Sequence, residues 1–129
     1  MKINRFEELG IWKLGIDIAV EIYKLTSKNN FSKDFGLRDQ IRRAAISISS
    51  NIAEGFEMTN NNDLVKFLRI AKGSAGETRS QLYLALKLEY VNYDKYEKLK
   101  EELEILSAKI GKFINYLIDK KKNKEFVSR

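Results

Sequence analysis

The chain has 129 residues, 33% of them charged, and a formal net charge of +6. It contains no cysteine and no histidine, which excludes disulfides, thiolate nucleophiles, the common zinc sites and the imidazole acid–base group. It also contains no proline, and this absence favours long, uninterrupted helices within a single domain.

This inventory predicts a protein that is not an enzyme and that holds no metal and no cofactor. The first nine residues include acidic side chains where a secretory signal would have an apolar core. No apolar run approaches the roughly 20 residues that crossing a bilayer requires. We therefore expect a cytoplasmic protein without a membrane partner.

The first helix is predicted from about Leu9 to Ser27, followed by a polar turn over residues 29–34. Apolar residues recur at helical spacing along its main face: Ile11, Leu14, Ile18, Ile22 and Leu25. A second apolar stripe lies beside them: Trp12, Ile16, Ala19 and Tyr23. Two stripes are wider than the single apolar face that one bundle core needs.

The second helix is predicted from about Phe35 to Phe56, with Gly55 as a C-terminal stop. Ten consecutive uncharged residues separate Arg43 from Glu54. One face of this stretch is apolar: Ile41, Ala45, Ile48 and Ile52. The far side is polar but uncharged: Ser47, Ser50 and Asn51. Because a surface helix normally carries charge on its far side, we infer that both faces are covered and that the protein self-associates.

The third helix is predicted from about Asn62 to Tyr90, after a run of possible N-caps. Gly73 and Gly76 lie in its middle, where each glycine costs about 1 kcal/mol relative to alanine. Their small size predicts a close helix–helix or subunit contact. Other apolar residues point away from its inward face: Ile70, Leu84 and Leu88.

The fourth helix is predicted to follow Asn92 as its cap. A heptad seam runs along it: Tyr96, Leu99, Leu103, Leu106, Ile110, Phe113 and Leu117. Four long helices joined by short polar turns predict an all-α, up-down-up-down antiparallel four-helix bundle. We expect one domain over residues 1–119, followed by a basic tail over residues 120–129.

Two segments carry a family resemblance. Residues 40–55 resemble the signature of the four-helix-bundle proteins encoded in intervening sequences of bacterial large-subunit rRNA genes, and residues 67–74 with Glu77 resemble its second signature. The resemblance implies a bundle that assembles as a ring, typically a homopentamer, without known catalysis. The family is also similar to the accessory proteins of diversity-generating retroelements, which form basic pentamers that engage nucleic acid and a reverse transcriptase.

Several residues in or near these segments are candidates for structural or interface roles: Arg43, Ser47, Asn51, Glu54, Gly73 and Glu77. Arg43 and Glu77 fall at similar heights on neighbouring antiparallel helices, so we predict a buried or interfacial pair that fixes register or subunit geometry. Asn51 is expected to make a register-setting hydrogen bond. A hydrolase or nuclease would need carboxylates such as Glu54 and Glu77 to hold a metal, and the neighbouring Arg43 argues against that.

Basic residues recur one helical turn apart on the second and third helices: Arg38, Arg42, Lys66, Arg69 and Lys72. The tail adds a further cluster: Lys120, Lys121, Lys122 and Lys124. Each strip is either a solvated face or a set of phosphate contacts, and a homo-oligomer would multiply the charge. We predict a homo-oligomer with weak electrostatic affinity for RNA or DNA. The alternative is a scaffold on whose ring a protein partner docks, without a nucleic-acid role.

Overall fold

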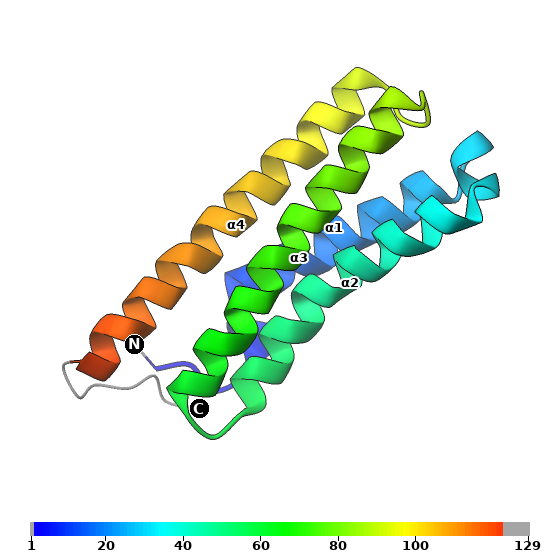
Figure 1. The fold of residues 1–129 in the computed structure, drawn as a ribbon. Coiled ribbons are helices and arrows are strands. Elements are labelled where there is room, and N and C mark those ends of the chain that lie inside the picture. The colour runs from blue at the N-terminus through cyan, green and yellow to red at the C-terminus, as the bar shows by residue number, and fades with distance from the viewer. Residues whose placement is uncertain (1, 123–129) are drawn as a thin grey trace.

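The protein is an all-α bundle of four helices, as predicted (Figure 1). The computed structural model describes residues 2–122, with side chains through residue 120. Its long helices are α1 (Gly10–Thr26), α2 (Phe35–Glu57), α3 (Asn61–Lys87) and α4 (Tyr93–Lys122), preceded and interrupted by the 3₁₀ turns η1 (Phe6–Glu8) and η2 (Asn29–Lys33). No helix within the described residues has the length and apolarity needed to span a bilayer.

Side-chain caps start three of the helices. The Oδ1 atoms of Asp34, Asn60 and Asn92 accept hydrogen bonds from backbone N–H groups three residues ahead, at 3.1, 2.9 and 2.8 Å. The predicted cap at Asn92 is therefore confirmed. The third helix ends earlier than predicted, at Lys87, because the backbone of Glu89 turns into the left-handed region with φ of 64°.

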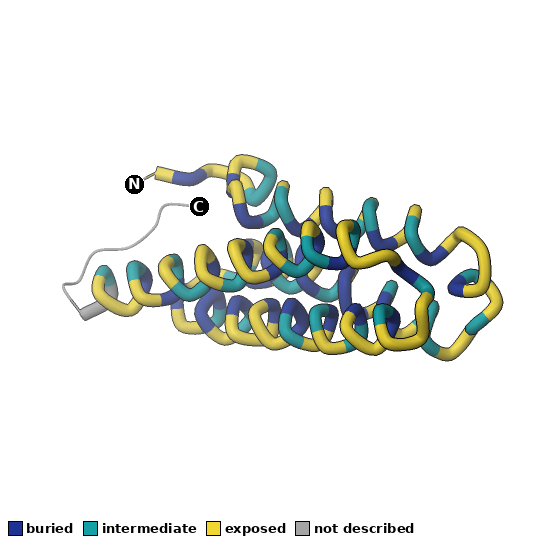
Figure 2. The backbone as a smooth tube through the Cα atoms, turned by 90° about the horizontal axis from the view of Figure 1, so that it is seen from above, coloured by how far each residue is buried: buried dark blue, intermediate teal, exposed yellow. Residues whose placement is uncertain are grey.

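The core lies along the inward side of every helix (Figure 2). Its largest fully buried side chains include Ile18 and Ile22 of α1, Ile48 of α2, Leu68 of α3 and Leu103 of α4. The predicted seam of α4 differs at one position. Ile114 is buried there and Phe113 only partly so, because a helix of 3.6 residues per turn drifts from a strict heptad repeat.

The two hairpins pack closely at one end and diverge at the other. Among the four neighbouring pairs of long helices, α2 and α3 pack most extensively and α1 and α4 least. Figure 1 shows the α1–α2 pair diverging from the α3–α4 pair toward η2. Phe31 of η2 is fully buried and helps to fill the widening end. The sequence pattern predicts only a polar turn at this position.

Within the protomer, Gly55 and Gly73 do not have the roles that the sequence predicts. Gly55 is not a C-terminal stop, since α2 continues to Glu57, but a Cβ there would lie 2.6 Å from the Cβ of Phe67. It therefore lets α2 and α3 approach closely. A Cβ at Gly73 or at Gly76 would meet no neighbouring element within 4 Å, so the predicted close helix–helix contact is wrong within the protomer.

Candidate functional site

One outer surface of the bundle combines exposed apolar side chains with charged and small polar ones. On α3, Ile70, Glu77 and Leu84 are each seven residues apart, so they lie in one line. On α2, Arg43, Ile46 and Ser47 lie beside that line. We call these six residues the α2–α3 face. A shallow depression of about 440 Å³ lies within it, lined by Gln40, Arg43, Ala44, Ile46, Ser47 and Glu77.

The α2–α3 face carries three large apolar side chains that are partly exposed to water. Ile46, Ile70 and Leu84 are 40, 45 and 47% exposed, respectively. Between Arg43 and Glu54 the outer side of α2 has no charge, as the sequence indicates. The face is therefore a candidate for contact with another protein surface.

The predicted Arg43–Glu77 pair is not buried. The two residues line the same depression, as their predicted heights require, but both are exposed. Among the described residues neither forms an ion pair. Both side chains leave the helices on the outer side, away from the core positions Ala45 and Ala75, and this geometry keeps them in solvent. A pairing between subunits stays a prediction.

A small hydrogen-bond network crosses from α2 to α3 beneath this face. The Oγ atoms of Ser47 and Ser74 are 2.9 Å apart. The Asn51 amide donates to the backbone oxygen and to Oγ of Ser47, at 2.7 and 2.9 Å. The partners of Asn51 thus lie on its own helix, and the register link between helices passes through Ser47 and Ser74. Sequence reasoning missed Ser74.

Two of the candidate phosphate-binding arginines make contacts inside the protomer. Arg42 donates through Nε to Thr26 Oγ1 at 2.7 Å and stacks over the Tyr23 ring at 4.4 Å. Arg38 pairs with Asp39 at 2.9 Å and lies over the Phe35 ring. The hydrogen bond from Arg38 is the main cause that lowers the pKa of Asp39. Both arginines therefore fix the position of neighbouring side chains.

The other basic candidates lie mostly on the outer surface of α3. Lys66, Arg69 and Lys72 are exposed, and none forms an ion pair with an acidic residue in the described part of the chain. Lys120 lies over the Tyr116 ring at 5.3 Å, in the last turns of α4, where the predicted tail begins. Lys124 lies outside the described residues, as do the side chains of Lys121 and Lys122.

The described residues include no group of three or more metal-ligating side chains that could hold an ion. Glu54 is exposed on α2, and its predicted neighbour Glu77 lies on the α2–α3 face instead of in a carboxylate cluster. The alternative of a metal-dependent hydrolase therefore gains no support from the described side chains.

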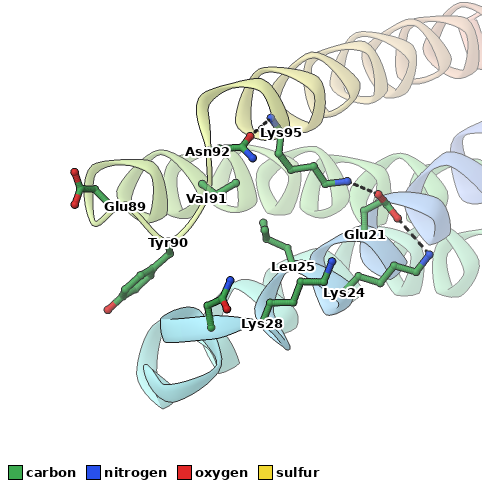
Figure 3. A pocket seen from close by; sticks show the side chains of 10 residues that line it. Glu21, Lys24, Leu25, Lys28, Glu89, Tyr90, Val91, Asn92 and Lys95 are labelled. Carbon is green, nitrogen blue, oxygen red and sulfur yellow. Dashed lines mark hydrogen bonds and ion pairs between the residues drawn. The ribbon is translucent and has the colours of Figure 1, made fainter.

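A pocket of about 540 Å³ opens between the diverging hairpins, and the sequence pattern did not point to it (Figure 3). Lys24, Lys28 and Lys95 line it together with Glu21. Glu21 Oε1 lies 2.6 Å from Lys95 Nζ, and its Oε2 lies 3.7 Å from Lys24 Nζ. The hydrogen bond from Lys95 is the main cause that lowers the pKa of Glu21. Because Glu21 and Glu89 line the pocket together with the three lysines, its lining carries a net charge of only +1.

Comparison with known proteins agrees with the resemblance in the sequence. Residues 7–112 match the family described as 23S rRNA-intervening sequence protein. The chain belongs to this family. A solved structure from Bacteroides thetaiotaomicron, described as a protein with unknown function from the S23 ribosomal protein family, is 28% identical with a TM-score of 0.74. The alignment covers 81% of this chain and 97% of that chain.

The match to the 23S rRNA-intervening sequence protein family includes the whole α2–α3 face and stops before the basic tail. The family description names no catalytic activity. A search of curated proteins gives no match. The similarity to the accessory proteins of diversity-generating retroelements stays a prediction.

Proposed function

We propose that this protein is a non-catalytic, cytoplasmic homo-oligomer that binds nucleic acid weakly through charge. The observation that supports self-association is the α2–α3 face, where three large apolar side chains stand 40–47% exposed beside an arginine and a glutamate that lack ion-pair partners in the described protomer. Burying such a patch against a second copy would remove apolar area from water, at roughly 25 cal/mol per Å².

The nucleic-acid part of the proposal rests on net charge and on the outer surface of α3. The chain carries a net charge of +6, and an oligomer repeats that charge in each copy. Arg69 and Lys72 are exposed one turn apart, without acidic partners among the described residues. Contacts of this kind release counterions from a phosphate backbone, so affinity falls steeply with salt and carries no sequence preference.

Native mass spectrometry and gel shifts with a single-stranded RNA at two salt concentrations test the two parts separately. We expect a mass several times the 15.0 kDa of the protomer, together with RNA binding at low salt that disappears at high salt. An oligomer that binds neither RNA nor DNA at low salt would favour the alternative, a scaffold for a protein partner. A 15.0 kDa species at micromolar concentration would refute self-association.

A matched pair of variants locates the binding surface. Replacing Lys72 with glutamine removes an exposed charge from α3, whereas replacing Lys24 removes a charge that is paired with Glu21. Both variants change the net charge by one. We expect Lys72→Gln to reduce the slope of log affinity against log salt by about 1, and Lys24→Gln to leave the slope unchanged. If both variants reduced this slope equally, net charge alone would govern binding.

A further inference from the structure

A groove lies where α3 packs beside α4, apart from the α2–α3 face. The two helices run side by side (Figure 1), and a depression of about 330 Å³ lies between them, toward the end where α3 leads into α4. We call its lining residues the α3–α4 groove: Gly76, Arg79, Ser80, Tyr83, Tyr96 and Lys100. Two of these residues are cations and none is acidic, whereas the depression in the α2–α3 face has one residue of each sign.

Three tyrosine rings are grouped at the α3–α4 groove. Tyr96 is buried, and the rings of Tyr83 and Tyr93 pack near its ring, with centroids 6.1 and 6.4 Å away. Tyr83 and Tyr93 are nevertheless 52 and 63% exposed. Tyr96 therefore supports two aromatic rings that stay largely in water. Because a tyrosine side chain has only two rotatable bonds, little further entropy is lost when a flat ligand stacks on such a ring.

The junction of α3 and α4 also carries two of the cations already described on α3. Lys72 reaches over α4, since its Cε lies 3.4 Å from the position that a Cβ on Gly111 would occupy. Arg69 lines a smaller depression of about 220 Å³, to which Ile118 of α4 contributes. Both cations therefore continue the line of the α3–α4 groove. This line extends about 21 Å along the helix axis from Arg69 to Tyr83, which is room for several nucleotides.

Acidic residues are sparse along this side of α3. Residues 69–87 include four basic side chains and one acidic side chain, Glu77, and Glu77 belongs to the α2–α3 face. Arg79 forms no ion pair within the described part of the chain. Lys100 of α4 is less available, because Glu97 Oε1 lies 3.7 Å from its Nζ. An anionic chain would therefore follow α3, with Arg79 next to the tyrosine rings.

We propose that single-stranded nucleic acid binds along the α3–α4 groove, with its phosphates on Arg69, Lys72 and Arg79 and with bases stacked on Tyr83 and Tyr93. This inference rests on the proposed nucleic-acid binding and specifies its site and the form of its ligand. Every base has a face that can stack on a tyrosine ring, so the site tolerates any sequence. Unpaired bases are available for such stacking, whereas paired bases stack on one another inside a duplex.

Two oligonucleotides with equal numbers of phosphates separate stacking from charge. One is a short single-stranded oligothymidylate, and the other has the same sugar–phosphate backbone without bases. Fluorescence anisotropy at low salt measures the affinity of the full-length protein for each. We expect the base-bearing strand to bind about tenfold more tightly. Tyr83→Ala should remove most of this preference and leave the affinity for the abasic strand unchanged.

Matched variants separate the ring from other effects of substitution. Phe35→Ala is the control, because Phe35 is an exposed aromatic residue beside an arginine but lies on α2, outside the groove. It should leave both affinities unchanged. Tyr83→Phe keeps the ring and should keep the preference. Tyr93→Ala repeats the test at the neighbouring ring, and its exposure makes the substitution compatible with the fold. Arg79→Gln should weaken binding to both strands alike and reduce the salt slope by about 1.

The inference and the proposed function fail in different ways. Equal affinity of the unmodified protein for the two strands would overturn the inference, as would an unchanged preference in both alanine variants of the tyrosines. Loss of the preference in Tyr83→Phe would also overturn it, because that variant retains the stacking ring. In each of these cases the proposed electrostatic binding still stands. If the unmodified protein binds neither strand at low salt, the proposed nucleic-acid binding is wrong, and the inference is wrong with it.

Discussion

Tyr90 donates a hydrogen bond from Oη to Oδ2 of Asp34 at 2.9 Å, across the end where the hairpins diverge. The other carboxylate oxygen, Oδ1, accepts from the backbone N–H of Leu37 and caps α2. The Tyr90 ring packs on the buried Phe31 ring, with centroids 5.2 Å apart. These contacts join the start of α2 to the connection after α3. The hydrogen bond to Asp34 is the main cause that raises the pKa of Tyr90.

Replacing Tyr90 with phenylalanine should lower the free energy of unfolding at neutral pH and less so in strong alkali. A raised pKa in the folded state means that this stabilisation is present below the unfolded pKa of about 10 and is lost as pH rises through the folded pKa. Urea denaturation of both proteins at neutral and alkaline pH measures the difference. Tyr93→Phe is the control, because Tyr93 is exposed. A difference that persists at high pH would contradict the assignment.

Glu21 should stabilise the bundle only above the acid range. Its pKa is lowered, chiefly by the hydrogen bond from Lys95, so its contribution is present above the unfolded pKa of about 4.3 and is lost as pH falls through the folded pKa. The pair is partly solvated, which limits the cost of Glu21→Gln at neutral pH to about 1 kcal/mol or less. Urea denaturation of Glu21→Gln and of the unmodified protein, at neutral pH and at about pH 3, measures the difference in their free energies of unfolding. Glu97→Gln, which breaks a pair within α4, should change stability less.

The sequence predicts the four helices well because each has a strong periodic pattern and clear polar turns. The Asn92 cap and most of the α4 seam follow directly from residue type and spacing. The burial of Phe31 does not, because a single aromatic residue in a polar turn gives no period. Its position depends on the divergence of two hairpins, which is a property of the whole fold.

The candidate site could be predicted only in part. The uncharged outer side of α2 and the equal heights of Arg43 and Glu77 are visible in the pattern, but their exposure depends on how far each side chain turns from the core. The glycines show the same limit. A glycine inside a helix predicts a close approach or an end, and only the neighbour across the interface distinguishes Gly55 from Gly73.

Alanine at these glycines should have effects of opposite sign. Gly55→Ala places a Cβ 2.6 Å from the Cβ of Phe67, and overpacking of this kind typically costs about 1–3 kcal/mol. Gly73→Ala meets no neighbouring element and should stabilise α3 by about 1 kcal/mol. Gly76→Ala is a second open position for comparison. Urea denaturation at a fixed protein concentration measures all three. Destabilisation by Gly73→Ala would show that the position is crowded in the assembled protein.

Arg42→Lys separates a structural role for this arginine from a phosphate contact, because the substitution keeps the charge. The guanidinium donates to Thr26 Oγ1 at 2.7 Å and to Ser27 Oγ at 3.0 Å, and it stacks on Tyr23. A lysine cannot reproduce this planar arrangement, so we expect a loss of about 1–2 kcal/mol in the free energy of unfolding. Electrostatic RNA binding at low salt should not change. Unchanged stability combined with weaker RNA binding would instead place Arg42 among the phosphate contacts.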